Sequence, residues 1–224
     1  MPDHLHLLLF ATDKLKYHLG RYMGMFKVRT GQMYREKYRL DGPVFTEDFY
    51  DCILYKNRSL DTIFKYLRDN PRRLAVRREH PEYFRRVNNL TVGGRRVQAY
   101  GNILLLRSPF MAQVVVHRRD TEDVRRAMRE RWLYTAANGG VLVSPFISPA
   151  EKTVRDEAEA LGAKIILISN RAMGERYKPA ARDFALCEQG RLLILTPEGI
   201  DPSLSRAACL EMNSIAEALC SDSV

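Results

Sequence analysis

The amino-acid sequence predicts an α/β protein in two parts, and three observations support this fold class. Beyond about residue 88, short continuous apolar segments alternate with helical segments, which is typical of a parallel sheet covered on both faces. Before that point, the chain is more basic and its helical segments are longer. No Gly/Ser-rich linker separates the two parts, so we expect them to pack closely. We therefore expect one domain over residues 1–87 and a Rossmann-like parallel α/β domain over residues 88–224.

The second part carries a regular alternation of predicted strands and helices. β-branched and aliphatic runs predict the strands, and amphipathic windows bounded by turn residues predict the helices. A Gly93-Gly94 turn interrupts the first strand segment. The strands are expected at 90–99, 113–116, 140–144, 164–169 and 191–196, and the helices at 121–136, 149–161, 180–188 and 204–219.

The first part predicts a smaller sheet with helices, an α+β arrangement. Apolar runs predict strands at 4–10 and 49–55, and a long basic segment predicts a helix over 13–38 that its glycines break. Ser59 is a candidate N-cap for a further helix. Because Pro71 disfavours helical geometry at the preceding residue, we expect that helix to end there and a short helix to follow at 72–79, with a kink at Pro71 as the alternative.

The positive charge is concentrated in the first part of the chain. The formal net charge is +9, and residues 1–90 contain 18 Lys and Arg residues against 11 Asp and Glu residues. This excess favours a polyanionic partner, although a solvated basic surface is the alternative. The four cysteines form no CxxC pair, and no apolar run is long enough to span a bilayer. We expect a cytoplasmic protein with free thiols and no membrane association.

The N-terminal segment Met-Pro-Asp-His-Leu-His places two histidines two residues apart. On a strand, positions i and i+2 face the same side, so His4 and His6 would present two imidazoles to one divalent cation. Such a pair is also common on ordinary strand surfaces. Metal binding is therefore only one of two interpretations of this segment alone.

A second segment, Tyr-Leu-Arg-Asp-Asn-Pro, places Tyr66 and Asn70 on one face of a helix. The amide oxygen of Asn70 is a suitable ligand for Mg²⁺ or Mn²⁺. A tyrosine oxygen beside a metal ion is suited to phosphodiester transfer through a covalent phosphotyrosine. The alternative is a packed tyrosine followed by an ordinary helix stop.

Together, these motifs resemble the single-tyrosine, His-x-His (HUH-type) transposases of the insertion-sequence 200-like and REP-associated families. The resemblance covers about residues 1–86. It includes Gly-Pro-Val-Phe at 42–45 and the segment at 49–54, which lie in the expected order between the two motifs. Asp3 stands where the family has asparagine, and Leu67 where it has isoleucine. In the family a strand and a helix precede the His-x-His strand, so we expect this domain to be N-terminally truncated.

The resemblance implies metal-dependent cleavage and rejoining of single-stranded or hairpin DNA through a 5′-phosphotyrosine. It implies Tyr66 as the nucleophile, and His4, His6 and Asn70 as ligands of Mg²⁺ or Mn²⁺. It also implies a possible homodimer. Basic residues on and after the tyrosine helix become candidates for contacts with DNA phosphates, with a solvated face as the alternative. These residues are Arg68, Arg72, Arg73, Arg77 and Arg78.

The second part is loosely similar to the Rossmann-like folds of DNA-processing proteins of the DprA type. Residues 139–146 form its most ligand-like stretch, because their strand ends where α/β sheets place their sites. Ser148, Pro149 and Glu151 predict a capped helix N-terminus, which either binds an anion or only caps the helix. No GxGxxG or Walker A sequence is present, so no nucleotide is predicted.

These observations favour a DNA transposase or a REP-processing nuclease with an appended α/β module. Two other classes stay open. The first is a non-catalytic DNA- or nucleotide-binding protein that carries a truncated transposase remnant. The second is a metabolic α/β enzyme unrelated to DNA, which leaves the ordered motifs of the first part unexplained.

Overall fold

The computed structural model describes residues 5–10, 13–49, 60–174 and 177–221. The chain forms two compact units, Met1–Arg72 and Arg73–Val224. Helix α2 (Leu60–Glu79) runs across this division. This division lies before the change of composition near residue 88. The segment between them, residues 73–87, is charged but belongs to the second unit, where the ring centroids of Phe84 and Phe184 lie 5.1 Å apart.

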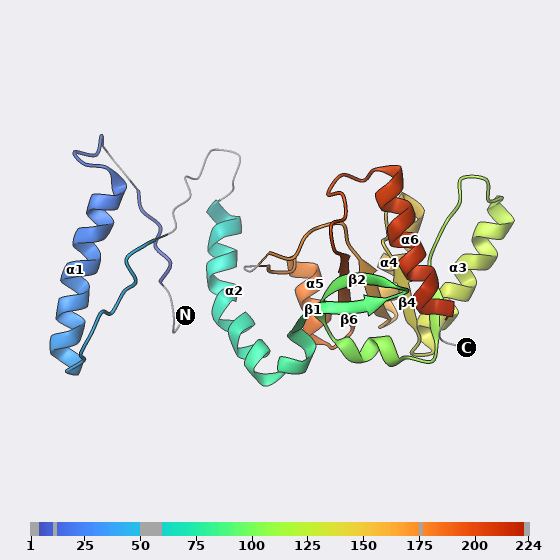
Figure 1. Ribbon diagram of the computed structural model, residues 1–224, viewed down its shortest axis with the longest axis horizontal. Helices are drawn as coiled ribbons and strands as arrows, with labels where there is room; N and C mark the ends of the chain where they lie inside the picture. Colours follow the sequence, from blue (N-terminus) through green and yellow to red (C-terminus); the bar gives the residue numbers. More distant parts are fainter. Residues whose placement is uncertain (1–4, 11–12, 50–59, 175–176, 222–224) are drawn as a thin grey trace. The chain divides into compact units, whose positions relative to one another are not determined.

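The second unit is built on a six-stranded mixed sheet with strand order β1-β2-β6-β5-β4-β3 (Figure 1). The last four strands in this order are mutually parallel, which confirms the α/β class. The first two strands are antiparallel to each other, and β2 is antiparallel to β6. The strands are β1 (Arg85–Val92), β2 (Arg95–Gly101), β3 (Met111–Gln113), β4 (Val141–Ser144), β5 (Lys164–Ile168) and β6 (Leu192–Pro197).

The antiparallel hairpin corrects the expectation of a wholly parallel sheet. Gly93 and Gly94 have φ angles of 53° and 72°, the left-handed values that a two-residue hairpin turn requires. The turn reverses the chain, so β2 must run against β1. At the far end of β2, Gly101 has φ 125°, and an added Cβ would lie 2.3 Å from the carbonyl oxygen of Leu192. Only glycine fits there.

Helices cover both faces of this sheet, as the sequence predicted. Trp132, Val154 and Cys187 come from three helices and share one apolar cluster with one face of the sheet. Met212 and Ile215, from the last helix, share the cluster on the opposite face. The helices of the first face are α3 (Glu122–Ala137), α4 (Pro149–Ala160) and α5 (Ala181–Glu188), and the opposite face carries α6 (Arg206–Ser221).

The central strands are continuously apolar because both of their sides are buried. All residues of β4 and of β6 are buried. The predicted strands and helices of this unit are confirmed, with small shifts at their ends. The strand expected at 113–116 forms earlier in the chain, as β3, and the two ranges share only Gln113. Beyond β3, the N–H of Val114 still donates to the carbonyl of Val143 at 3.0 Å. Short 3-10 helices form at η1 (Pro81–Phe84) and η2 (Ile103–Arg107).

The first unit is organised around α1 (Leu19–Tyr38) and the first part of α2. The segment after α1 folds back along it, where Gly31 admits the side chains of Val44 and Phe45 to 3.8 Å from its Cβ position. The ammonium of Lys27 donates to the carbonyls of residues 46, 47 and 48 at 2.8, 3.1 and 2.6 Å. In the described part of this unit, only Gly31 and Asn70 are buried.

Three expectations for the first unit were wrong. Residues 5–10 form no strand, because a strand requires a partner and the described residues of this unit contain none. Helix α1 begins at Leu19, where His18 has the extended backbone of an N-cap, and its glycines do not break it. Helix α2 continues through Pro71 and does not end before it. The strand expected at 49–55 falls almost wholly outside the described residues.

Candidate functional site

Three of the residues predicted to carry chemistry meet in the first unit, although more than fifty residues separate His6 from the other two. The side-chain amide nitrogen of Asn70 lies 3.3 Å from His6 Nε2, at hydrogen-bond distance. The amide nitrogen donates and Nε2 accepts when the imidazole proton is on Nδ1. The rings of His6 and Tyr66 meet edge to face, with centroids 6.0 Å apart and planes at 81°.

Helix α2 positions two of these side chains. Tyr66 and Asn70 are one turn apart and therefore share a helix face, as the spacing predicted. Asn70 is 5% exposed, whereas Tyr66 is 37% exposed. The site thus combines a buried amide, an exposed imidazole and a phenol that solvent and a large substrate can reach.

The donor atoms of this pair suit a divalent cation. Neighbouring ligands of an octahedral ion lie about 3 Å apart when each is about 2.1 Å from the metal. The 3.3 Å between His6 Nε2 and the Asn70 amide is close to this spacing, and rotating the amide would turn its oxygen toward the imidazole. His4, the remaining predicted ligand, lies outside the described residues. Among the described residues, no group of three His, Cys, Asp or Glu side chains could hold a metal ion.

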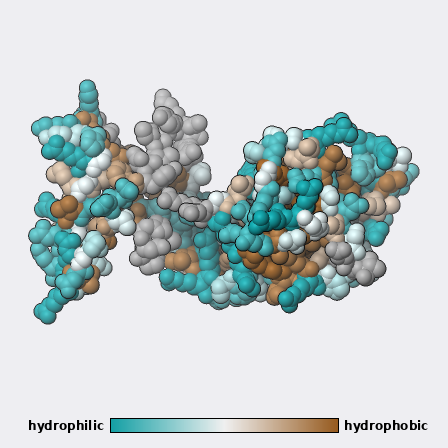
Figure 2. Space-filling model, viewed as in Figure 1, coloured by the Kyte–Doolittle hydropathy of each residue, from teal (hydrophilic) through white to brown (hydrophobic). Residues whose placement is uncertain are grey.

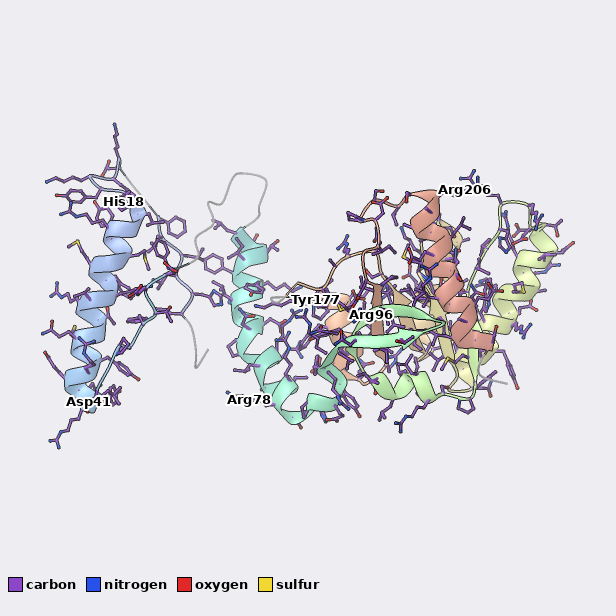
Figure 3. All side chains as sticks on the ribbon, in the orientation of Figure 1. His18, Asp41, Arg78, Arg96, Tyr177 and Arg206 are labelled. Carbon is purple, nitrogen blue, oxygen red and sulfur yellow. The ribbon has the colours of Figure 1, made fainter. Side chains whose placement is uncertain are left out.

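The arginines predicted to contact DNA have different environments. Arg68 and Arg78 are exposed, and Figure 3 labels Arg78 near the end of α2. Arg72 forms an ion pair with Asp69, with Nε 2.8 Å from the carboxylate oxygen. That ion pair is exposed, so it stabilises the helix only slightly.

The other two predicted arginines pack on aromatic rings of the second unit. The guanidinium of Arg73 lies 4.4 Å from the ring centroid of Phe184. That of Arg77 lies 5.5 Å from the same ring and 5.9 Å from Phe84. Cation–π contacts of this kind give both arginines a structural role in the second unit. Contact with DNA phosphate stays a prediction for all five, and Arg68 and Arg78 are the most accessible candidates.

The sequence predicted a ligand site at the carboxyl edge of the large sheet. There, the polar groups of Ser148 and Glu151 are used in hydrogen bonds to the backbone. Glu151 is buried, and its carboxylate accepts hydrogen bonds from the backbone N–H groups of Val116, Ile147 and Ser148 at 3.2, 2.8 and 3.0 Å. The hydroxyl of Ser148 accepts from the N–H of Glu151, which completes the predicted capping box. This geometry supports the capping interpretation.

A hollow of about 400 Å³ lies at the opposite edge of the same sheet. It is lined by residues that precede β4 and by Lys164 at the start of β5. The hollow therefore lies at the amino ends of β4 and β5, whereas ligand sites in open α/β sheets lie at the carboxyl ends of the strands.

Buried titratable groups in the second unit are held in their neutral forms. Burial raises the pKa of Tyr177 and that of Cys187 to about 12 each, and the Asp183 carboxylate adds to both shifts. Burial also raises the pKa of Tyr100, whose ring meets that of Tyr177 edge to face. A thiol that stays protonated is a poor nucleophile at neutral pH. Tyr100 and Cys187 belong to the apolar core of the second unit, and Tyr177 packs against it.

The sequence analysis assigned no role to a group of surface residues on α1. Tyr34 and Tyr38 lie on the exposed side of α1, with ring centroids 4.4 Å apart. Lys37 Nζ lies 5.3 Å from the ring centroid of Tyr38. The sequence contains a signal for this pair: two tyrosines four residues apart, with basic residues between them. On a helix, this spacing brings the two side chains together.

The described architecture defines an α/β protein whose first unit unites a histidine, a tyrosine and an asparagine. No protein-family model matches the chain, and no curated protein matches it. Among solved structures, the chain is similar to DNA processing protein A (DprA) from Streptococcus pneumoniae, with a TM-score of 0.42 and 16% identity. That match covers 92% of this chain and 76% of the other. Within the described residues, no helix is both long and apolar enough to cross a membrane.

Proposed function

We propose that the first unit cleaves and rejoins single-stranded DNA through a covalent bond to Tyr66. One observation carries this proposal: His6, Tyr66 and Asn70 converge in space, with His6 Nε2 3.3 Å from the Asn70 amide. An exposed phenol beside an imidazole and an amide is suited to tyrosine-mediated transfer of a phosphodiester. The basic composition of this half supports a polyanionic substrate.

In the proposed reaction, the Tyr66 oxygen attacks the phosphorus of a DNA phosphodiester. The phenol loses its proton, a bond forms between the tyrosine oxygen and phosphorus, and the bond from phosphorus to the 3′ oxygen breaks. The departing 3′ oxygen takes up a proton, and the 5′ end stays attached to the protein. Because one phosphodiester replaces another, a 3′ hydroxyl can reverse the step and rejoin the strand.

A divalent cation fits the donor atoms of His6 and Asn70, with His4 as a further ligand in the proposal. When bound, such an ion would polarise the phosphate oxygens and stabilise the charge that develops on them. Imidazole nitrogens suit Mn²⁺ better than Mg²⁺, so Mn²⁺ is the first ion to test. In the absence of the ion, the contact of His6 Nε2 with the Asn70 amide orients the His6 ring.

The test is formation of a covalent adduct. The full chain is incubated with 3′-labelled hairpin DNA that carries single-stranded flanks, in the presence of Mn²⁺, and analysed on a denaturing gel. We expect an adduct that is lost with a chelator and in Tyr66→Phe, because phenylalanine lacks the attacking oxygen. An adduct formed equally by Tyr66→Phe would contradict the assignment of the nucleophile.

Tyr22 provides a matched control, because it lies in the same unit and is also 37% exposed. Tyr22→Phe should form as much adduct as the unmodified chain. If the unmodified chain binds the hairpin but forms no adduct with either ion, the non-catalytic DNA-binding function replaces the enzymatic one.

A further inference from the structure

We infer that the outer face of α1, centred on Tyr34 and Tyr38, is a stacking surface for the bases of single-stranded DNA. We call it the α1 tyrosine face. The inference rests on the proposed function for its choice of DNA as the partner, but it adds a binding surface outside the group of His6, Tyr66 and Asn70.

The two rings are placed for stacking. Tyr34 and Tyr38 are 46% and 51% exposed, with ring centroids 4.4 Å apart and planes 43° apart. Figure 3 shows the side chains that project from α1, between the labelled His18 and Asp41, and Figure 2 shows that hydrophilic and hydrophobic residues are mixed at the surface of the first unit. Exposed aromatic rings offer faces on which unpaired bases can stack.

The charge around these rings favours an anionic partner. Helix α1 contains five Lys and Arg residues and a single acidic residue, Glu36, which accepts a hydrogen bond from Gln32. In the part of the chain that the structure describes, Arg29, Arg35 and Lys37 pair with no carboxylate. Cations interleaved with aromatic rings are the two components of single-strand binding surfaces, one for phosphates and one for bases.

The strand must be single because a tyrosine can stack only on the face of an unpaired base. In duplex DNA, neighbouring bases cover these faces, and sequence-independent contact is limited to phosphates and sugars. A second copy of this chain is the competing occupant. It would have to bring the same positive charge against itself, which opposes association.

The binding test uses the full chain, a fluorescein-labelled oligothymidine and fluorescence anisotropy in EDTA, so that no cleavage occurs. We expect Tyr34→Ala and Tyr38→Ala each to weaken binding at least about fivefold, because each removes one stacking partner. Tyr38→Phe should bind within about twofold of the unmodified chain, because the ring is kept. Circular dichroism confirms that α1 stays helical in each variant.

Tyr134 is the control, since it is 65% exposed on α3 of the second unit. Tyr134→Ala should leave the affinity unchanged. Equal affinity of Tyr34→Ala, Tyr38→Ala and the unmodified chain would overturn the inference, as would an equal loss in Tyr134→Ala. Duplex DNA that binds as tightly, with the same dependence on Tyr34 and Tyr38, would also overturn it.

A second readout detects stacking directly. The chain has one tryptophan, Trp132, which is 2% exposed and donates to the carbonyl of Gln113 at 2.8 Å. A Tyr38→Trp variant therefore adds one accessible indole to a shielded background, and oligothymidine should quench that added fluorescence. Absence of quenching at saturating DNA would contradict base stacking.

Sedimentation velocity separates the two possible occupants. If Tyr34→Ala and Tyr38→Ala abolish self-association and leave DNA affinity unchanged, the face belongs to a second copy and the inference is wrong. The cleavage proposal fails separately. An adduct at Tyr66 with no effect of Tyr34 or Tyr38 on DNA binding overturns only the inference, whereas weakened binding without any adduct overturns only the cleavage proposal.

Discussion

The two units differ sharply in how they bury apolar residues. In the second unit, Val141, Ile165 and Leu195 are fully buried between helices on both faces of a sheet. In the first unit, Met25 and Val28 on α1 are 62% and 69% exposed. Because burial of apolar surface is the main source of folding free energy, the second unit carries most of the stability of the described chain.

The proposed chemistry, in contrast, lies wholly in the unit with little core. His6, Tyr66 and Asn70 depend on one helix face and one extended segment for their placement. Most of the stability thus comes from the second unit, whereas the proposed reaction takes place in the first. Surfaces that bind large substrates are commonly drawn from the less stable parts of proteins.

Hydrogen exchange should show the largest difference between the units. Backbone amides of β4, β5 and β6 should exchange at least about a thousandfold more slowly than those of α1, because the strands open only when the core unfolds. Deuterium uptake measured by mass spectrometry on peptides from each element tests this expectation. Equal protection of α1 and the strands would contradict the expected difference in stability between the two units. It would mean that a partner covers the first unit.

Removal of a core ring should show the next largest effect. Phe184 is fully buried and lies beneath the guanidinium of Arg73. Phe184→Ala should lower the free energy of unfolding by about 3–5 kcal/mol in urea titrations. Phe10 in the first unit is 72% exposed, so Phe10→Ala should change it by no more than about 0.5 kcal/mol. Similar losses in the two variants would contradict the unequal burial.

Alkaline pH should produce a smaller effect through Cys187. Its pKa is raised to about 12 by burial and by Asp183, with Arg77 opposing the shift, so the folded chain holds a proton that the unfolded chain releases near pH 9. The stabilisation is therefore complete below pH 9 and is lost as pH rises toward 12. At pH 10.5, we expect a loss of up to about 2 kcal/mol relative to pH 8.

Cys187→Ala isolates this contribution. The variant should be less stable at pH 8 because of the smaller side chain, but it should lose less stability between pH 8 and 10.5 in urea titrations. Burial raises the pKa of Tyr177 to about 12 as well, and Cys187 adds to that shift, so the difference between the two proteins also includes a smaller contribution from Tyr177. An identical loss in both proteins would show that the thiol titrates normally.

Local signals in the sequence predicted the second unit well. The Ser148–Glu151 pattern predicted a capping box, and both of its hydrogen bonds are present. Apolar runs bounded by turn residues predicted the central strands. The sequence did not predict that β2 pairs antiparallel with β6, because a pairing between distant strands leaves no local signal.

The same local signals were less reliable in the first unit. Residues 5–10 are apolar enough for a strand, but a strand also needs a neighbour to pair with. Pro71 signalled a helix end, yet α2 continues, at the cost of one backbone donor. The convergence of Tyr66 and Asn70 followed from helical spacing, whereas their proximity to His6 depends on tertiary structure and was suggested only by the resemblance.

The position of α2 limits how freely these two units could be exchanged with others during evolution. The helix begins in the unit that contains Tyr66 and ends in the unit where Arg73 and Arg77 cover Phe184. Modules joined by a flexible linker can be recombined at almost any linker position. Here, a cut between residues 87 and 88 would remove both arginines from Phe184. A gene encoding the second unit alone would need to retain the last turns of the tyrosine helix.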